Sequence, residues 1–126
     1  MLTYRIPWPP TQNHIWKHTC VDGKPRTYRT QRYKEFLDLV SLLVRPRRPI
    51  EGGVMVKMVF CPPDRRRYDV DNRCKAVLDA LTHCGVWGDD SQIVTLLACK
   101  GPVDKANPGV DIFIEEVEEV HERNRD

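Results

Sequence analysis

The sequence predicts a single α+β domain, in which a mixed β-sheet of about four strands carries two main helices. Its 126 residues suit one ordinary domain. Apolar residues recur with a helical period in two stretches, and four other stretches show the alternation or the short apolar run of a strand. The resulting order is strand, helix, strand, helix, strand, strand. That order is typical of helices packed on a sheet.

The first strand is expected at residues 2–6, where apolar and polar residues alternate until Pro7. Residues 11–29 are polar and aperiodic, so we expect a long loop, a feature that is usually functional or mobile. The first helix should follow Thr30, a candidate N-cap, and end before Pro46. Its apolar face is Tyr33, Phe36, Leu37, Val40, Leu43 and Val44.

Residues 54–61 alternate as a second strand, which Pro62 and Pro63 end. A second helix is expected to begin near Asp71 or Asn72 and to end at Gly85, a residue suited to the left-handed C-terminal position. Residues 92–100 and 110–117 predict two further strands. The second helix should bury Ala76, Val77, Ala80, Leu81 and Cys84.

Charge divides the chain into a domain at residues 1–115 and an acidic tail at 116–126, which is expected to be disordered or helical. Residues 115–126 hold six of the 18 acidic residues and two of the 20 Lys and Arg residues. The remaining chain therefore carries a net charge of +6. A basic body favours a polyanionic partner such as nucleic acid, although the excess could equally serve solubility alone.

The cysteines lack the spacing of a zinc site or a disulfide framework, so we expect reduced thiols that act mainly as small apolar residues. No apolar run is long enough to span a bilayer, and the N-terminus has no signal-peptide core. We expect a cytoplasmic protein without a membrane partner or a small-molecule cofactor. The five cysteines are Cys20, Cys61, Cys74, Cys84 and Cys99.

Residues 65–72 (RRRYDVDN) are the most informative stretch, because three arginines directly precede two carboxylates. In an extended backbone Asp69 and Asp71 would share one face. Two neighbouring carboxylates favour a bound cation, and Mg²⁺ prefers oxygen ligands. Arginines beside them would attract a phosphate that the acids alone repel.

A second acidic pair, Asp89 and Asp90, precedes the third strand. If that strand runs beside the second one, this loop could return to the Asp69 region and complete a metal site for phosphodiester hydrolysis. Lys75 lies one helical turn after Asp71, where it could contact phosphate or form an ordinary ion pair with Asp71 or Asp79. Asn72 could cap the helix or touch substrate.

These blocks closely resemble the RusA family of Holliday junction resolvases, which occurs typically in phages and prophages. The resemblance is collinear from the opening strand to about residue 115. The matching segments are residues 7–13 (PWPPTQN), 62–72 (PPDRRRYDVDN), Lys75, 78–81 (LDAL) and 85–92 (GVWGDDSQ).

The resemblance implies a homodimeric, Mg²⁺-dependent endonuclease that makes paired symmetric nicks in four-way DNA junctions, with Mn²⁺ able to replace Mg²⁺. It places the metal ligands on Asp69, Asp71 and Asp90, and a further catalytic role on Lys75. The residues expected at the DNA are Asn13, Arg65, Arg66, Arg67, Asn72 and Lys75. Tyr68 interrupts a basic run that often continues in the family, and the acidic tail lies outside the resemblance.

Two alternatives stay open. The same acids could serve another metal-dependent nuclease or phosphohydrolase that acts on flaps, single strands or nucleotides. A non-catalytic junction-binding module is the other alternative, but a pure binder gains nothing from a negative cluster facing phosphate. A two-fold dimer would suit the two symmetry-related strands of a junction.

Overall fold

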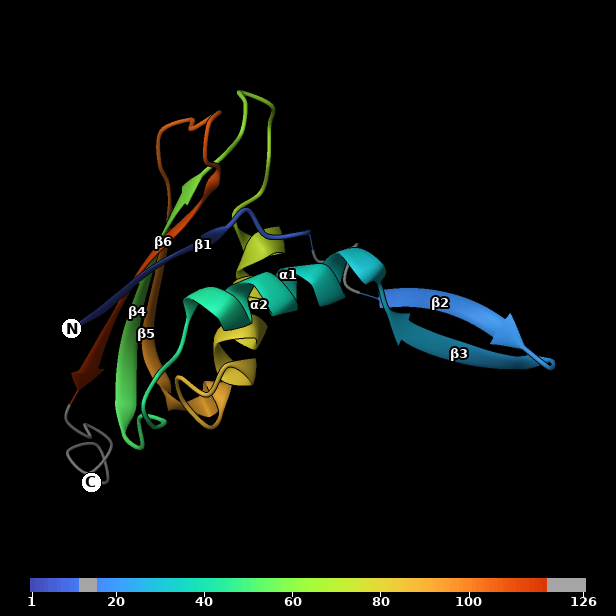
Figure 1. Cartoon of the computed structure of the whole chain (residues 1–126), viewed down its shortest axis with the longest axis horizontal. Coiled ribbons are helices and arrows are strands. Elements are labelled where there is room, and N and C mark those ends of the chain that lie inside the picture. The colour runs from blue at the N-terminus through green and yellow to red at the C-terminus, as the bar shows by residue number, and fades with distance from the viewer. Residues whose placement is uncertain (12–15, 118–126) are drawn as a thin grey trace, which may run out of the picture.

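The computed structural model describes residues 1–11 and 16–117. Figure 1 shows its elements in chain order. They are β1 (Leu2–Pro7), β2 (Trp16–Val21), β3 (Lys24–Arg29), α1 (Gln31–Leu43), β4 (Gly53–Cys61), α2 (Asp71–His83), the 3₁₀ helix η2 (Asp90–Gln92), β5 (Ile93–Lys100) and β6 (Gly109–Val117). None of the described helices is long and apolar enough to cross a membrane.

Four strands form the main sheet in the order β1-β6-β4-β5. β6 is antiparallel to both β1 and β4, with Ile114 opposite Leu2 on one side and Val56 on the other. β5 runs parallel to β4 and forms an outer edge of the sheet. The sheet is therefore mixed, which confirms the predicted α+β class.

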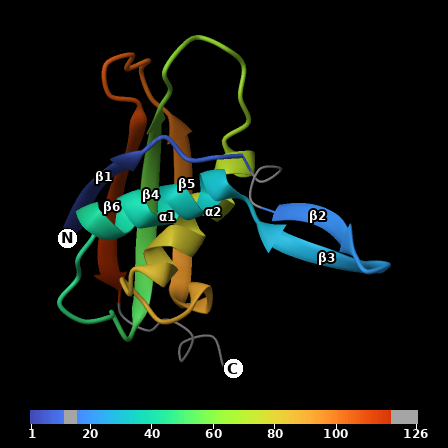
Figure 2. The ribbon, with the colours of Figure 1, turned by 45° about the vertical axis from the view of Figure 1, so that its right-hand side comes forward.

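Both helices cover the same face of this sheet (Figure 2). The residues of β4 that point to the helices are buried: Val54, Val56, Met58 and Phe60. The predicted apolar face of α1 is confirmed except at Leu43, which is 55% exposed. The helix ends there, and Val44 turns into the core instead. Thr30 caps α1, its hydroxyl accepting a hydrogen bond from the Tyr33 backbone amide.

The expected loop over residues 11–29 is wrong for most of its length, because β2 and β3 form an antiparallel hairpin. Its turn is Asp22-Gly23, with φ angles of 53° and 76°. This is the local signal for a two-residue hairpin turn. The apolar alternation of a buried strand is missing because every residue of β3 is exposed. Figure 1 shows the hairpin projecting away from the two layers.

The crossover β4–α2–β5 decides where the candidate residues lie. Its helix ends at Gly85 as predicted, with a φ angle of 83° and the Val86 amide bonded to the Leu81 carbonyl. Because β5 is parallel to β4, α2 must run back along the sheet before β5 begins. The loop after β4 and the loop before β5 are therefore at opposite ends of α2 (Figure 2).

Candidate active site along helix α2

The arginine loop, residues 62–70, joins β4 to α2 and carries Arg65, Arg66 and Arg67 on its exposed part. Arg66 pairs with Asp64 at 3.6 Å between Nε and Oδ2, and its side chain is 91% exposed. Arg65 and Arg67 form no ion pair with the described residues. An ion pair so open to solvent is weak. All three guanidinium groups can therefore reach a phosphate.

An aromatic cluster fixes the end of this loop. The ring of Tyr68 packs edge-to-face against Trp8 at 5.2 Å between centroids, and Lys100 lies 4.7 Å above the Tyr68 ring. Arg73 lies over Trp8 at 4.7 Å and donates to the Pro9 carbonyl. Burial raises the pKa of Tyr68, whose hydroxyl has no hydrogen-bond partner among the described residues. This cluster holds the residue that directly precedes Asp69.

Asp69 and Asp71 lie at the start of α2. The residue between them, Val70, has helical dihedral angles of −62° and −42° and is the N-cap. The expected extended arrangement of the two acids is therefore wrong, because the chain turns into the helix at Val70. Asn72 is not the cap: it lies inside the helix and donates from Nδ2 to Asp69 Oδ2 at 3.3 Å. Asp71 is exposed and forms no ion pair or hydrogen bond with the described residues.

Lys75 connects the two halves of the helix surface. Its Nζ lies 3.0 Å from Asp79 Oδ1 and 4.0 Å from Asp90 Oδ2, and its side chain is 54% exposed. The hydrogen bond and charge of Asp79 raise the pKa of Lys75, so it stays cationic. Asp71, Lys75 and Asp79 are spaced by four residues and share one face of α2. Asp90, on a separate segment, lies beside that same face.

Asp90 is held by the C-terminal half of α2. The Thr82 hydroxyl lies 2.6 Å from Asp90 Oδ1 and 3.0 Å from the Leu78 carbonyl, and its single hydrogen favours the shorter, charge-assisted bond. Thr82 Oγ1 in turn accepts from the indole Nε1 of the buried Trp87 at 2.7 Å. This chain of donors fixes the carboxylate while leaving Oδ2 directed at Lys75.

Gln92 anchors the Asp90 segment to the sheet. Its amide Nε2 donates to the carbonyls of Ile50 and Gly52 at 2.7 and 2.9 Å. Its Oε1 accepts from the amides of Gly88 and Asp89 at 2.9 and 3.1 Å. Asp89 completes a capping box by accepting from Ser91, which lowers the pKa of Asp89. Asp89 is thus engaged in shaping the turn.

The structure brings some of the predicted residues together and separates others. Lys75 and Asp90 meet, and Asn72 meets Asp69. Within residues 1–11 and 16–117, however, no group of three acids, histidines or cysteines lies close enough to hold one metal ion. The parallel crossover explains this, since eight helical residues from Asp71 to Asp79 rise about 12 Å. Asn13 lies outside the described residues.

Sequence reasoning missed Thr82, Trp87 and Gln92, which position Asp90. The four-residue spacing from Asp89 to Gln92 was the available signal, because it matches a capping box. The contacts of Thr82 and Trp87 have no local signal.

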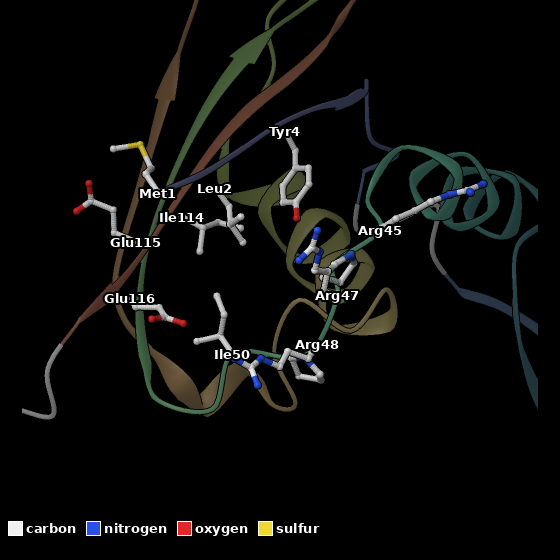
Figure 3. A pocket seen from close by; sticks show the side chains of 12 residues that line it. Met1, Leu2, Tyr4, Arg45, Arg47, Arg48, Ile50, Ile114, Glu115 and Glu116 are labelled. Atoms are coloured by element: carbon white, nitrogen blue, oxygen red, sulfur yellow. The ribbon is translucent and has the colours of Figure 1, made fainter.

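A second basic cluster lies in the loop after α1. Arg45, Arg47 and Arg48 border a hollow of about 710 Å³ beside β1 and β6. Figure 3 shows Arg47 and Arg48 on one side of this hollow and Glu115 and Glu116 on the other. The hollow shares no lining residue with the α2 site. Because both signs of charge line it, the hollow itself does not suit a phosphate group.

Comparisons with known proteins agree with this site. The family model described as Endodeoxyribonuclease RusA matches residues 7–115. A relative from Escherichia coli (strain K12) and one from Enterobacteria phage 82 are each 36% identical over 110 residues, covering 83% of this chain and 88% of the relative. A third relative, from Escherichia coli O139:H28, is 34% identical over the same length. Each is named Crossover junction endodeoxyribonuclease RusA.

The arginine loop, the carboxylates of α2 and these similarities define the class of protein, a DNA-cleaving endonuclease. The chain belongs to the RusA family of endodeoxyribonucleases.

Proposed function

We propose that this protein resolves Holliday junctions, cutting branched DNA by paired symmetric nicks in recombination and repair. The supporting observation is that Asp71, Lys75 and Asp90 border one face of α2 beside the arginine loop, in a chain whose relatives are named crossover junction endodeoxyribonucleases. DNA as substrate also accounts for the basic body, since phosphates attract Lys and Arg without regard to sequence. A cytoplasmic location and a homodimer belong to the same proposal.

We assign the metal ligands to Asp69, Asp71 and Asp90. The donor chemistry fits Mg²⁺, with Mn²⁺ as a substitute, because all three offer carboxylate oxygens and Asp71 has no competing ion pair or hydrogen bond among the described residues. When bound, the ion supplies Lewis acidity at the scissile phosphate and lowers the pKa of the attacking water. The acids lie along α2, so a shared ion requires Asp90 and the start of α2 to approach each other.

The remaining residues bind and orient the substrate. Arg65, Arg66 and Arg67 neutralise backbone phosphates on the approach to Asp69. Lys75, held cationic by Asp79, stabilises negative charge that develops at the phosphate. Asn72 orients the Asp69 carboxylate through its amide and faces the same substrate surface.

Nicking of a synthetic four-way junction in Mg²⁺ tests the function and the ligands together. Asp69→Asn, Asp71→Asn and Asp90→Asn are each expected to abolish cleavage while junction binding stays equal or becomes tighter, because a ligand is lost and repulsion of phosphate is relieved. Asp38→Asn, at an exposed position on α1, is the control and keeps wild-type activity. A near wild-type rate in any of the first three variants removes that residue from the ligand set.

Substrate choice separates the proposal from the other nuclease readings. Junction, flap, linear duplex, single-stranded and nucleotide substrates are compared at one salt and Mg²⁺ concentration. Preferential paired cleavage of the junction supports resolution. Equal or faster cleavage of flaps or single strands points to another metal-dependent nuclease, and binding without any cleavage points to a junction-binding module.

A further inference from the structure

Strand β5 is an outer edge of the main sheet and has no neighbour on its open side among the described residues. It follows Asp90 directly through η2. An edge strand presents a row of backbone N–H and C=O groups that can pair with another strand. Proteins usually protect such edges with charges, proline or a covering element. The seven residues from Ile93 to Cys99 contain neither a charged residue nor a proline.

The side chains of this edge are also apolar on both faces. In the register with β4, Leu96 lies opposite the buried Val56 and therefore points to the helix side, whereas Leu97 lies opposite Lys57 and points to the other side. Leu96 is 44% exposed, Leu97 is 53% exposed and Val94 is 56% exposed. One added strand would cover aliphatic groups on both faces at once. Packing against only one face of the sheet would not.

The surface continues beyond the edge strand on the side away from the helices. A hollow of about 340 Å³ there is lined by Leu97 and Thr95 of β5 and by Met55 and Phe113 of the next two strands. Met55 is 41% exposed. The patch is wider than one strand, and apolar patches of this kind mark protein contacts rather than DNA contacts. DNA would require cations, which residues 93–99 do not supply.

We propose that β5 is the dimer interface, where it pairs antiparallel with β5 of a second copy of this chain across a two-fold axis near Leu96 and Leu97. An edge strand is complementary to itself in this arrangement, because two-fold symmetry makes two identical strands antiparallel. The axis stands normal to the sheet, so the helix-covered faces of both copies lie on the same side. The two four-stranded sheets become one continuous sheet.

This inference rests on the proposed resolvase function, and it gives the dimer a geometry suited to that function. Each β5 begins just after Asp90, so antiparallel pairing places the two Asp90 segments at opposite ends of the interface. The two Ile93 residues lie roughly 20–23 Å apart along the strands, from about 3.3 Å per residue. Both helix faces that carry Lys75 are then presented on the same side of the joined sheet to a two-fold substrate.

Light scattering after size-exclusion chromatography of the full chain tests the interface without any nuclease assay. Leu96→Lys and Leu97→Lys are expected to raise the dimer dissociation constant roughly 100-fold or more, since each places two charges at the symmetric contact. Leu42→Lys is the matched control, because Leu42 is 62% exposed on α1, and this variant stays dimeric. A monomeric wild type, or dimeric Leu96→Lys and Leu97→Lys proteins, overturns the proposal.

Cysteine crosslinking keeps the proposal testable if the lysine variants do not fold. Leu96→Cys and Leu97→Cys are made in a Cys20→Ser background, which removes the exposed native thiol. A short bis-maleimide should join each variant into a covalent dimer, whereas Leu42→Cys stays uncrosslinked. No crosslinking above that control at either position overturns the interface. Junction cleavage by the wild type is scored separately, so failure of this interface and failure of the resolvase proposal are distinguishable.

Discussion

Lys75 shows how one side chain can take part in both stability and chemistry. The sequence left open whether it forms an ion pair or contacts phosphate. The structure shows the ion pair with Asp79 and a second carboxylate, Asp90, at 4.0 Å. An ion pair at a half-exposed lysine contributes little to stability. A role at the phosphate would instead appear in the cleavage rate.

Lys75→Ala is therefore expected to lower single-turnover cleavage of a four-way junction by roughly 10²- to 10³-fold, with a smaller change in junction affinity. Asp79→Asn is the matched variant, because it removes the ion-pair partner and keeps the lysine. It should retain most of the rate. Equal losses in both variants would mean that the ion pair, rather than a phosphate contact, explains the effect of Lys75.

Tyr33 reports on the packing between α1 and α2. It is 1% exposed, and burial together with the nearby Asp79 carboxylate raises its pKa to about 12. The unfolded chain ionises this phenol near pH 10, so stability from the neutral hydroxyl is fully present below pH 10 and is lost as the pH rises toward 12. Two pKa units correspond to about 2–3 kcal/mol.

Chemical denaturation between pH 9 and pH 12 checks this value. The free energy of unfolding of the wild type should fall across that range, and Tyr33→Phe should remove most of the tyrosine-dependent fall. Tyr28→Phe, at an exposed position on the hairpin, is the control and should behave as the wild type does. The same slope in Tyr33→Phe and wild type would contradict the assignment.

At the scale of the element, the segment before β5 is a turn closed by a single side chain. Gln92 makes two donor and two acceptor contacts that fasten Gly88 and Asp89 to the carbonyls of Ile50 and Gly52. Asp90 lies inside this turn, so its position depends on Gln92. The Thr82 hydroxyl fixes the carboxylate from the other side.

Gln92→Glu keeps both acceptor contacts but replaces the donating amide with a carboxylate facing two carbonyls. We expect a loss of about 1–3 kcal/mol in unfolding free energy and a reduced junction cleavage rate, with junction binding preserved. Ser91→Ala, which removes only a hydroxyl bond to the exposed Asp89, is the control. Wild-type stability and cleavage in Gln92→Glu would show that the turn holds Asp90 without this side chain.

At the scale of the whole molecule, basic groups lie in three separate places: the hairpin, the loop after α1, and the arginine loop before α2. The hairpin exposes Lys24 and Arg26 on a ribbon that projects from the body. The arginine loop is the set nearest to Asp69. Each set can contact a different part of a branched DNA molecule, so their contributions to affinity should be separable.

Replacing Arg65, Arg66 and Arg67 together by alanine should weaken binding to junctions of any sequence and flatten the dependence of affinity on salt, since fewer counterions are released. The fold should persist because these side chains are exposed. Binding titrations from low to physiological salt measure the slope, and Lys24→Ala with Arg26→Ala gives the comparison set. Unchanged affinity and slope in the arginine variant would leave DNA binding to the other two sets.

The sequence by itself determined the features that depend on residues a few positions apart. Alternation and helical periodicity predicted the four strands of the main sheet and both helices, and Thr30 and Gly85 marked helix ends that the structure confirms. The grouped arginines and aspartates indicated a phosphate-directed site. These signals are local because capping and amphipathic periodicity act over one or two turns of chain.

The tertiary structure alone decided where those elements lie. Polar residues 16–29 form a hairpin without the buried face that sequence patterns detect. The parallel pairing of β5 with β4 carries Asp90 to the far end of α2, away from Asp69, although Lys75 still reaches it. Burial of Trp87 brings its indole to Thr82, and Thr82 to Asp90. Such contacts depend on how distant segments pack, and no spacing along the chain encodes them.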